Sequence, residues 1–151
     1  MIDSEAQQII RDFPLGILAS VTPDGVPAAS PKGTFLVLDD MTLAYGDIRS
    51  PGTARNLAET AKAEVVFVDP FRRKGVRIAG ETDIVGKDDP RYGDLLPKWQ
   101  ATWGDLALRI RAIVLITATR VGHITTPPYD DGATEDEMIT LYKSKYAELY
   151  P

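Results

Sequence analysis

Apolar and polar residues alternate along much of the chain, and this pattern predicts strands rather than helices. Turn signals separate the alternating stretches, as in Pro23-Asp24-Gly25. Pro27 and Pro31 lie inside the second stretch and indicate an edge or bulged strand, because proline cannot donate to a β-ladder. The predicted strands cover residues 15–22, 26–38, 41–46, 64–69, 76–85 and 106–121.

Helical signals occur early in the chain and again after the third predicted strand. Ser4-Glu5-Ala6-Gln7 matches a capping box and predicts a short helix that stops before Pro14. A second helix is expected over residues 51–62, where the helical period places four apolar residues on one buried face. These four residues are Ala54, Leu57, Ala58 and Ala61.

The last third of the chain adds two more helical segments. Residues 89–104 favour a loose helical excursion, and Thr134-Glu135-Asp136-Glu137 is a second capping box.

Strands with one helix inserted after residue 46 favour a small closed or half-open antiparallel barrel. We expect a single domain over residues 1–151, in which residues 129–151 form an acidic helical tail. The apolar face of that tail is predicted to hold Met138, Leu141, Tyr142 and Leu149.

Charge is unevenly distributed and limits the kinds of ligand. The net charge is −5, and the tail carries six acids against two bases. Basic residues gather in the middle of the sequence, which suits a small anionic ligand better than nucleic acid. Arg72-Arg73-Lys74 reads as a solvated hairpin tip. No apolar run reaches membrane-spanning length, no signal peptide is recognisable and cysteine is absent, so a cytoplasmic protein is expected.

The segment around residue 50 is the strongest candidate for a binding site. Ser50 suits a helix N-cap and Pro51 the first helical position, so unpaired N–H groups face outward at the positive end of the helix dipole. Gly52 allows close approach to the backbone, and Arg49, Thr53 and Arg55 add donors. A phosphate monoester would fit here. An ordinary capped helix with two surface arginines fits the same residues equally well.

Several kinds of catalysis are excluded by composition. The chain has one histidine, His123, and no cysteine, which removes histidine metal clusters and thiol chemistry. Gly-x-Ser-x-Gly and Gly-x-Gly-x-x-Gly are both absent. We therefore assign no catalytic side chain and no metal ligand, and expect any redox chemistry to come from a bound cofactor.

Several strings in this order resemble the pyridoxamine 5′-phosphate oxidase-like family of flavin mononucleotide (FMN)-binding split barrels. They are residues 15–21, 30–33, 45–47, 49–57 and 76–80, together with the ending Thr126-Pro127-Pro128-Tyr129. The resemblance implies a mainly β fold, a six-stranded antiparallel split β-barrel of Greek-key type with a few peripheral helices. It also implies a homodimer with FMN at the subunit interface. The C-terminal substrate-binding segment of the true oxidase has no counterpart here.

The resemblance also implies where the cofactor would bind. Ser30, Lys32 and Gly33 would border the isoalloxazine ring. The neighbouring strand end would be formed by Tyr45, Gly46 and Asp47. The phosphate would be held by Ser50, Thr53, Arg55 and Asn56.

The implied function is an FMN-binding oxidoreductase of unassigned small-molecule substrate, with NADH or NADPH as a candidate donor. A deazaflavin-dependent reductase and a non-enzymatic flavin- or haem-binding sensor stay open as alternatives. Tyr92, Trp99 and Trp103 would either cap an apolar ligand over the ring or fill the core.

Overall fold

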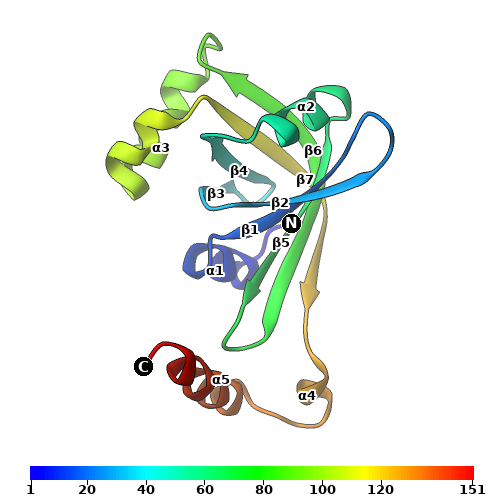
Figure 1. The fold of residues 1–151 in the computed structure, drawn as a ribbon, viewed down its shortest axis with the longest axis vertical. Helices are drawn as coiled ribbons and strands as arrows, with labels where there is room; N and C mark the ends of the chain where they lie inside the picture. Colours follow the sequence, from blue (N-terminus) through cyan, green and yellow to red (C-terminus); the bar gives the residue numbers. More distant parts are fainter.

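The computed structural model describes residues 1–151, whose strands form one antiparallel seven-stranded sheet (Figure 1). The order across the sheet is β2-β1-β5-β6-β7-β4-β3. The fold is the predicted split barrel, with one strand more than expected. The strands are β1 (Gly16–Val21), β2 (Pro27–Lys32), β3 (Phe35–Asp39), β4 (Thr42–Asp47), β5 (Lys62–Asp69), β6 (Lys74–Gly86) and β7 (Ala112–Ile124).

The additional strand arises because the predicted run 26–38 is two strands. The run breaks at Gly33 and Thr34, and its two halves lie at opposite edges of the sheet. The hydroxyl of Thr34 donates to the carbonyl of Gly46 at 2.7 Å and accepts from the Gly46 N–H at 3.1 Å. These bonds fix the crossing point beside the end of β4. Pro27 and Pro31 lie in β2, an edge strand as predicted.

The helices lie around the sheet, mostly at its two ends (Figure 1). Asp3, and not Ser4, caps the first helix, since its carboxylate accepts from the Ala6 N–H at 2.9 Å. The predicted capping box over residues 4–7 was therefore wrong, whereas the one at Thr134 is confirmed. The helices are α1 (Ser4–Asp12), α2 (Pro51–Glu59), α3 (Tyr92–Trp103), the 3₁₀ helix η1 (Gly104–Arg109), α4 (Pro127–Asp130) and α5 (Glu135–Leu149).

The prediction of one strand over residues 106–121 was wrong for the first residues of that range. Its leucines alternate, but Leu106 and Leu108 are 39% and 65% exposed in η1, so their period does not mark a buried sheet face. The strand begins only at Ala112 and runs on to Ile124. No helix of the structure is both long enough and apolar enough to cross a membrane.

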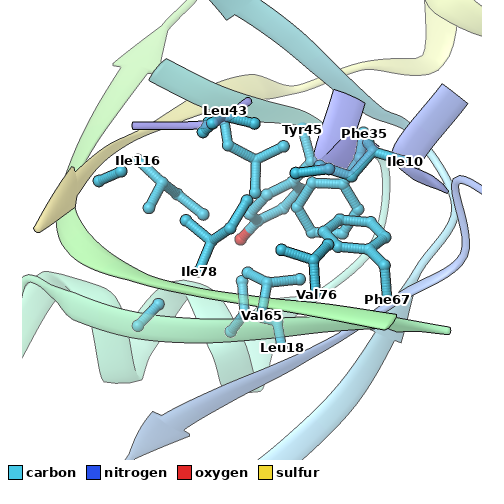
Figure 2. Close-up of a cluster of buried hydrophobic side chains, with 14 of the residues drawn as sticks. Ile10, Leu18, Phe35, Leu43, Tyr45, Val65, Phe67, Val76, Ile78 and Ile116 are labelled. Carbon is cyan, nitrogen blue, oxygen red and sulfur yellow. The ribbon is translucent and has the colours of Figure 1, made fainter. Parts of the chain in front are cut away.

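The main core fills the barrel between the sheet and α1 (Figure 2). Phe35 packs edge-on against Phe67, with 4.9 Å between ring centroids, and lies 5.3 Å from the ring of Tyr45. Each fully buried large apolar side chain contributes about 1.5–3 kcal/mol. The other labelled members are Ile10, Leu18, Leu43, Val65, Val76, Ile78 and Ile116.

A second, smaller core joins α3 and η1 to the open end of the sheet. Trp99 is fully buried there, and its indole N–H donates to the Thr34 carbonyl at 2.8 Å. A Cβ at Gly46 would lie 2.5 Å from Cδ1 of Ile110, so any larger residue would force this buried side chain to move. The cluster consists of Ala44, Val85, Trp99, Ala107, Ile110 and Ile113.

The turn between β5 and β6 is covered by the C-terminal tail, so the prediction of a solvated tip was wrong. Arg72 forms ion pairs with Asp69 at 2.6 Å and Glu135 at 3.6 Å, and Lys74 pairs with Glu135 at 2.8 Å. The guanidinium of Arg73 lies 3.9 Å from the ring centroid of Tyr142. These contacts hold α5 at the end of the molecule opposite α2 and α3 (Figure 1).

The predicted apolar face of the tail is only partly used. Met138 is buried, but Leu141 and Leu149 are 46% and 67% exposed. An aromatic pair adds to the contacts between α5 and the β5–β6 turn: the ring centroids of Phe71 and Tyr146 lie 5.4 Å apart.

Candidate functional site

Lys32, the last residue of β2, reaches the first turn of α2. Its ammonium donates to Ser30 Oγ at 2.9 Å, Ser50 Oγ at 2.8 Å and Thr53 Oγ1 at 3.0 Å. The resemblance assigned Ser30 and Lys32 to the ring and Ser50 and Thr53 to the phosphate, and the structure brings all four together. The candidate site is therefore one polar cluster that joins a sheet edge to a helix start.

Ser50 holds the N-cap position, but its hydroxyl makes no capping hydrogen bond. The hydroxyl accepts from Lys32 instead, so the expected cap is absent. Pro51 has no N–H, and the Ala54 N–H bonds to the Ser50 carbonyl at 2.9 Å. The N–H groups of Gly52 and Thr53 are therefore left without an intrahelical partner at the positive end of the helix dipole.

A cavity of about 470 Å³ opens over this helix start. Gly52 borders it, and a Cβ there would meet only Arg55 Nη2, at 4.0 Å. Arg55 is exposed, as expected, and lies on the same rim. The lining residues are Ser20, Thr22, Ala28, Ser30, Arg49, Ser50, Pro51, Gly52, Thr53, Arg55 and Asn56.

The predicted face of α2 was only partly right, because the helix buries polar residues beside this cavity. Leu57 is buried as predicted, but Thr53 and Asn56 are buried as well, and Ala58 is exposed. Asn56 Nδ2 donates to Ser20 Oγ at 3.1 Å, which ties the helix to β1. The helix ends at Glu59, earlier than the predicted residue 62.

A second depression of about 350 Å³ adjoins the first and shares Arg49 and Ser50 with it. Arg109 of η1 borders this depression, and sequence reasoning missed it because η1 was predicted as a strand. Its rim carries three bases and no acid. The lining residues are Pro31, Lys32, Gly33, Thr34, Gly46, Ile48, Arg49, Ser50 and Arg109.

The buried charge of Lys32 has no close acidic partner. The residue is 6% exposed, and its three hydrogen-bond acceptors are all neutral hydroxyls. Burial lowers the pKa of Lys32, and the more distant charge of Asp47 opposes this effect. Asp47 is itself buried, and its Oδ1 has no hydrogen-bond partner. An anion in the cavity would supply the charge that Lys32 lacks.

Four further predicted site residues, Gly33, Tyr45, Gly46 and Asp47, lie outside the larger cavity. Tyr45 is 1% exposed and packs inside the barrel (Figure 2), where burial raises its pKa above the usual range. Gly33 and Gly46 line the second depression. Asp47 borders neither cavity. The side chains of Ser30, Ser50, Thr53, Arg55 and Asn56 all belong to the larger cavity.

The aromatic residues of α3 belong to the core. Tyr92 donates its hydroxyl to the Ile110 carbonyl at 2.9 Å, and Trp99 is fully buried. His123 lies outside the site, where its Nε2 is 2.7 Å from Asp3 Oδ2 at the start of α1.

The fold and this cluster together define a small antiparallel split barrel with a basic, hydroxyl-rich cavity at one edge. A family model described as pyridoxamine 5′-phosphate oxidase matches residues 2–126. The chain belongs to this family. The matched segment includes the whole barrel and the start of α2, and it ends before α4 and α5. No curated protein sequence matches the chain.

Solved structures share the fold. HupZ of Group A Streptococcus is 26% identical, with a TM-score of 0.72, over 83% of this chain and 96% of that one. A pyridoxamine 5′-phosphate oxidase-related, FMN-binding protein of Nostoc punctiforme is 22% identical, with a TM-score of 0.59, over 81% of each chain. HutZ of Vibrio cholerae, described as a haem storage protein, is 15% identical, with a TM-score of 0.63, over 82% of this chain and 94% of that one.

Proposed function

We propose that this protein binds FMN and passes electrons or hydride through it to a small-molecule substrate. The observation that carries the proposal is the buried Lys32, whose charge has no close acidic partner and which lies behind a cavity lined by hydroxyls and a helix N-terminus. Such a set suits a terminal phosphate. Membership of the pyridoxamine 5′-phosphate oxidase family supports a flavin as the bearer of that phosphate.

The residues around the cavity would hold the cofactor and take no direct part in the chemistry. When bound, flavin accepts and returns hydride or single electrons at its ring. Arg55 and the free N–H groups of α2 would fix the phosphate. The bases Arg49 and Arg109 would add positive charge where the second depression adjoins this cavity. No step requires a cysteine or a histidine.

The wider proposal is a cytoplasmic homodimer that takes electrons from NADH or NADPH. One of the solved structures of this fold is described as a haem storage protein, so haem is the second candidate ligand. His123 is the only histidine and lines neither the cavity at α2 nor the second depression, so this site offers haem no axial histidine. FMN is therefore the candidate that the site favours.

The absorption spectrum of the purified protein tests the cofactor. We expect an oxidised-flavin spectrum after loading with FMN, and bleaching on addition of NADH or NADPH if the protein is a reductase. Titration with FMN and with flavin adenine dinucleotide should show tighter binding of FMN, because the cavity at α2 suits a terminal phosphate. Equal or tighter binding of the dinucleotide, or a spectrum of haem or deazaflavin from the purified protein, would overturn the proposal.

A further inference from the structure

We propose that Lys32 is a positioning residue: it turns the hydroxyl protons of Ser30, Ser50 and Thr53 toward one anion, without touching that anion itself. This inference rests on the proposed function, because it concerns how the same cavity recognises a terminal phosphate.

The hydrogen bonds of Lys32 occupy all of its protons. A protonated ammonium group has three N–H donors and no acceptor. Lys32 makes three hydrogen bonds, of 2.8–3.0 Å, and each goes to a different hydroxyl oxygen. Its donors are therefore fully used inside the protein, and none is left for a ligand.

The hydroxyls that accept from Lys32 each keep a proton of their own. A hydroxyl has one donor proton and two acceptor lone pairs. When it accepts from Lys32, its own proton must point elsewhere. None of the three hydroxyls donates to another protein group, and Ser50 does not cap α2. All three O–H groups are thus free donors.

The three hydroxyl donors border one cavity. Ser30, Ser50 and Thr53 line the 470 Å³ cavity, whereas Lys32 does not. The ammonium lies behind the hydroxyls, and its side chain borders only the adjoining depression. Three hydroxyl donors, the N–H groups of Gly52 and Thr53 and the guanidinium of Arg55 therefore converge on one space. A phosphate monoester has three terminal oxygens to receive them, whereas a diester or a carboxylate has only two.

The test compares Lys32→Met with the wild-type protein, using FMN, riboflavin and inorganic phosphate as probes. FMN affinity should fall about a hundredfold, because the hydroxyls lose both their orientation and the positive charge behind them. Riboflavin, which lacks the phosphate, should bind within about threefold of wild type. Lys87→Met, which changes an exposed lysine in the turn after β6, is the matched control and should alter nothing.

Three further measurements separate positioning from a structural role. Flavin-free Lys32→Met should melt no earlier than wild type, since methionine fills the same space without a buried charge. Thr53→Val removes one hydroxyl and should weaken FMN about tenfold, while Thr53→Ser should restore the affinity. The ³¹P resonance of bound FMN should shift in Thr53→Val and return in Thr53→Ser.

The outcomes can be told apart. Equal losses of FMN and riboflavin in Lys32→Met would overturn the inference, because Lys32 would then contact the ring. Unchanged FMN affinity in Lys32→Met or Thr53→Val would also overturn it. If wild type binds no flavin, the proposed function fails, and inorganic phosphate decides the inference alone. Phosphate binding that disappears in Lys32→Met and in Thr53→Val would support it, whereas absence of phosphate binding in wild type would contradict it.

Discussion

Lys32 and Arg55 both place positive charge at the cavity over α2, but they differ in burial. Lys32 is buried and fully hydrogen-bonded, whereas Arg55 is exposed and makes no hydrogen bond or ion pair to another residue. A buried unpaired charge opposes folding, while an exposed one has little effect on stability. Substitutions at the two positions should therefore separate ligand binding from folding.

Replacing Arg55 by alanine should weaken FMN about tenfold to a hundredfold, because a charge-assisted hydrogen bond contributes about 1.5–3 kcal/mol. The melting temperature of the flavin-free protein should barely move. Flavin titration and thermal denaturation check both parts, with Arg11→Ala, an exposed arginine of α1, as the control. Early unfolding of the flavin-free variant with unchanged affinity would show that Arg55 is structural.

FMN binding should be accompanied by proton uptake at alkaline pH. Burial lowers the pKa of Lys32 from its ordinary value of 10.5, so between the two pKa values the unfolded chain carries a proton that the folded chain has lost. Stability of the flavin-free protein therefore rises with pH across this window. A bound phosphate raises the pKa of Lys32 again, so affinity should fall as pH rises.

Calorimetric titration in buffers of different ionisation enthalpy measures this proton uptake. The part that belongs to Lys32 should be absent in Lys32→Met. The same uptake in that variant would assign it to another group.

At the start of α1, the single histidine has a structural role. Asp3 caps α1 through the Ala6 N–H and contacts His123 of β7 through its other oxygen. Asp3→Ala should cost about 0.5–2 kcal/mol, because it removes the cap. His123→Ala should cost less than about 1 kcal/mol, because the pair is partly exposed.

The reduction rate of bound flavin should stay within about threefold in His123→Ala, since loss of a general acid or base usually costs a hundredfold or more. Stopped-flow reduction by dithionite or a nicotinamide donor measures this rate. A hundredfold fall, with flavin bound and the fold intact, would show that His123 takes part in the chemistry.

The contact between α5 and the β5–β6 turn depends on Glu135. Lys74 lowers the pKa of Glu135 below its ordinary value of 4.5, so the pair stabilises α5 above that pH and is lost as pH falls through the lowered value. Glu135→Gln should speed amide hydrogen exchange in α5 and leave the barrel unchanged. Glu148→Gln, at the exposed end of the same helix, should have no effect. Equal exchange in both variants would mean that Phe71 and Tyr146 hold the helix without help from charge.

A strand or helix could be predicted where the residues that determine it are close together in the sequence. Alternation and turn residues predicted the barrel strands, and Pro27 and Pro31 predicted an edge strand. The break at Gly33 was not predictable, because it depends on Thr34 bonding to Gly46 across the fold. Leu106 and Leu108 alternate without being buried, which led to the wrong strand.

The candidate site was predicted in part for the same reason. The helix start and its donors were visible as a short string of residues. The placement of Lys32 against Ser50 and Thr53 was not, since the partners lie 18 and 21 residues away in sequence.

For the whole molecule, we predict a homodimer. Apolar side chains remain on the outer surface of the sheet, where Ile17, Val21 and Val68 are 44%, 39% and 45% exposed. Burial of such residues between two copies would remove them from water. Light scattering at micromolar concentration with FMN present should give twice the mass of one chain, and a monomeric mass would contradict the prediction.

The hydrogen bonds of Lys32 also bear on how the molecule comes apart. The sheet has two free edges, β2 and β3, and Lys32 at the end of β2 is fastened to the helix that follows β4, the neighbour of β3. The cluster thus joins elements whose strands lie far apart in the order of the sheet. We predict that these hydrogen bonds form late in folding, because they join elements that lie at opposite ends of the strand order. A phosphate bound at this cluster would then slow unfolding and leave the folding rate unchanged. The protein with bound phosphate would therefore have a longer half-life before unfolding than the free protein.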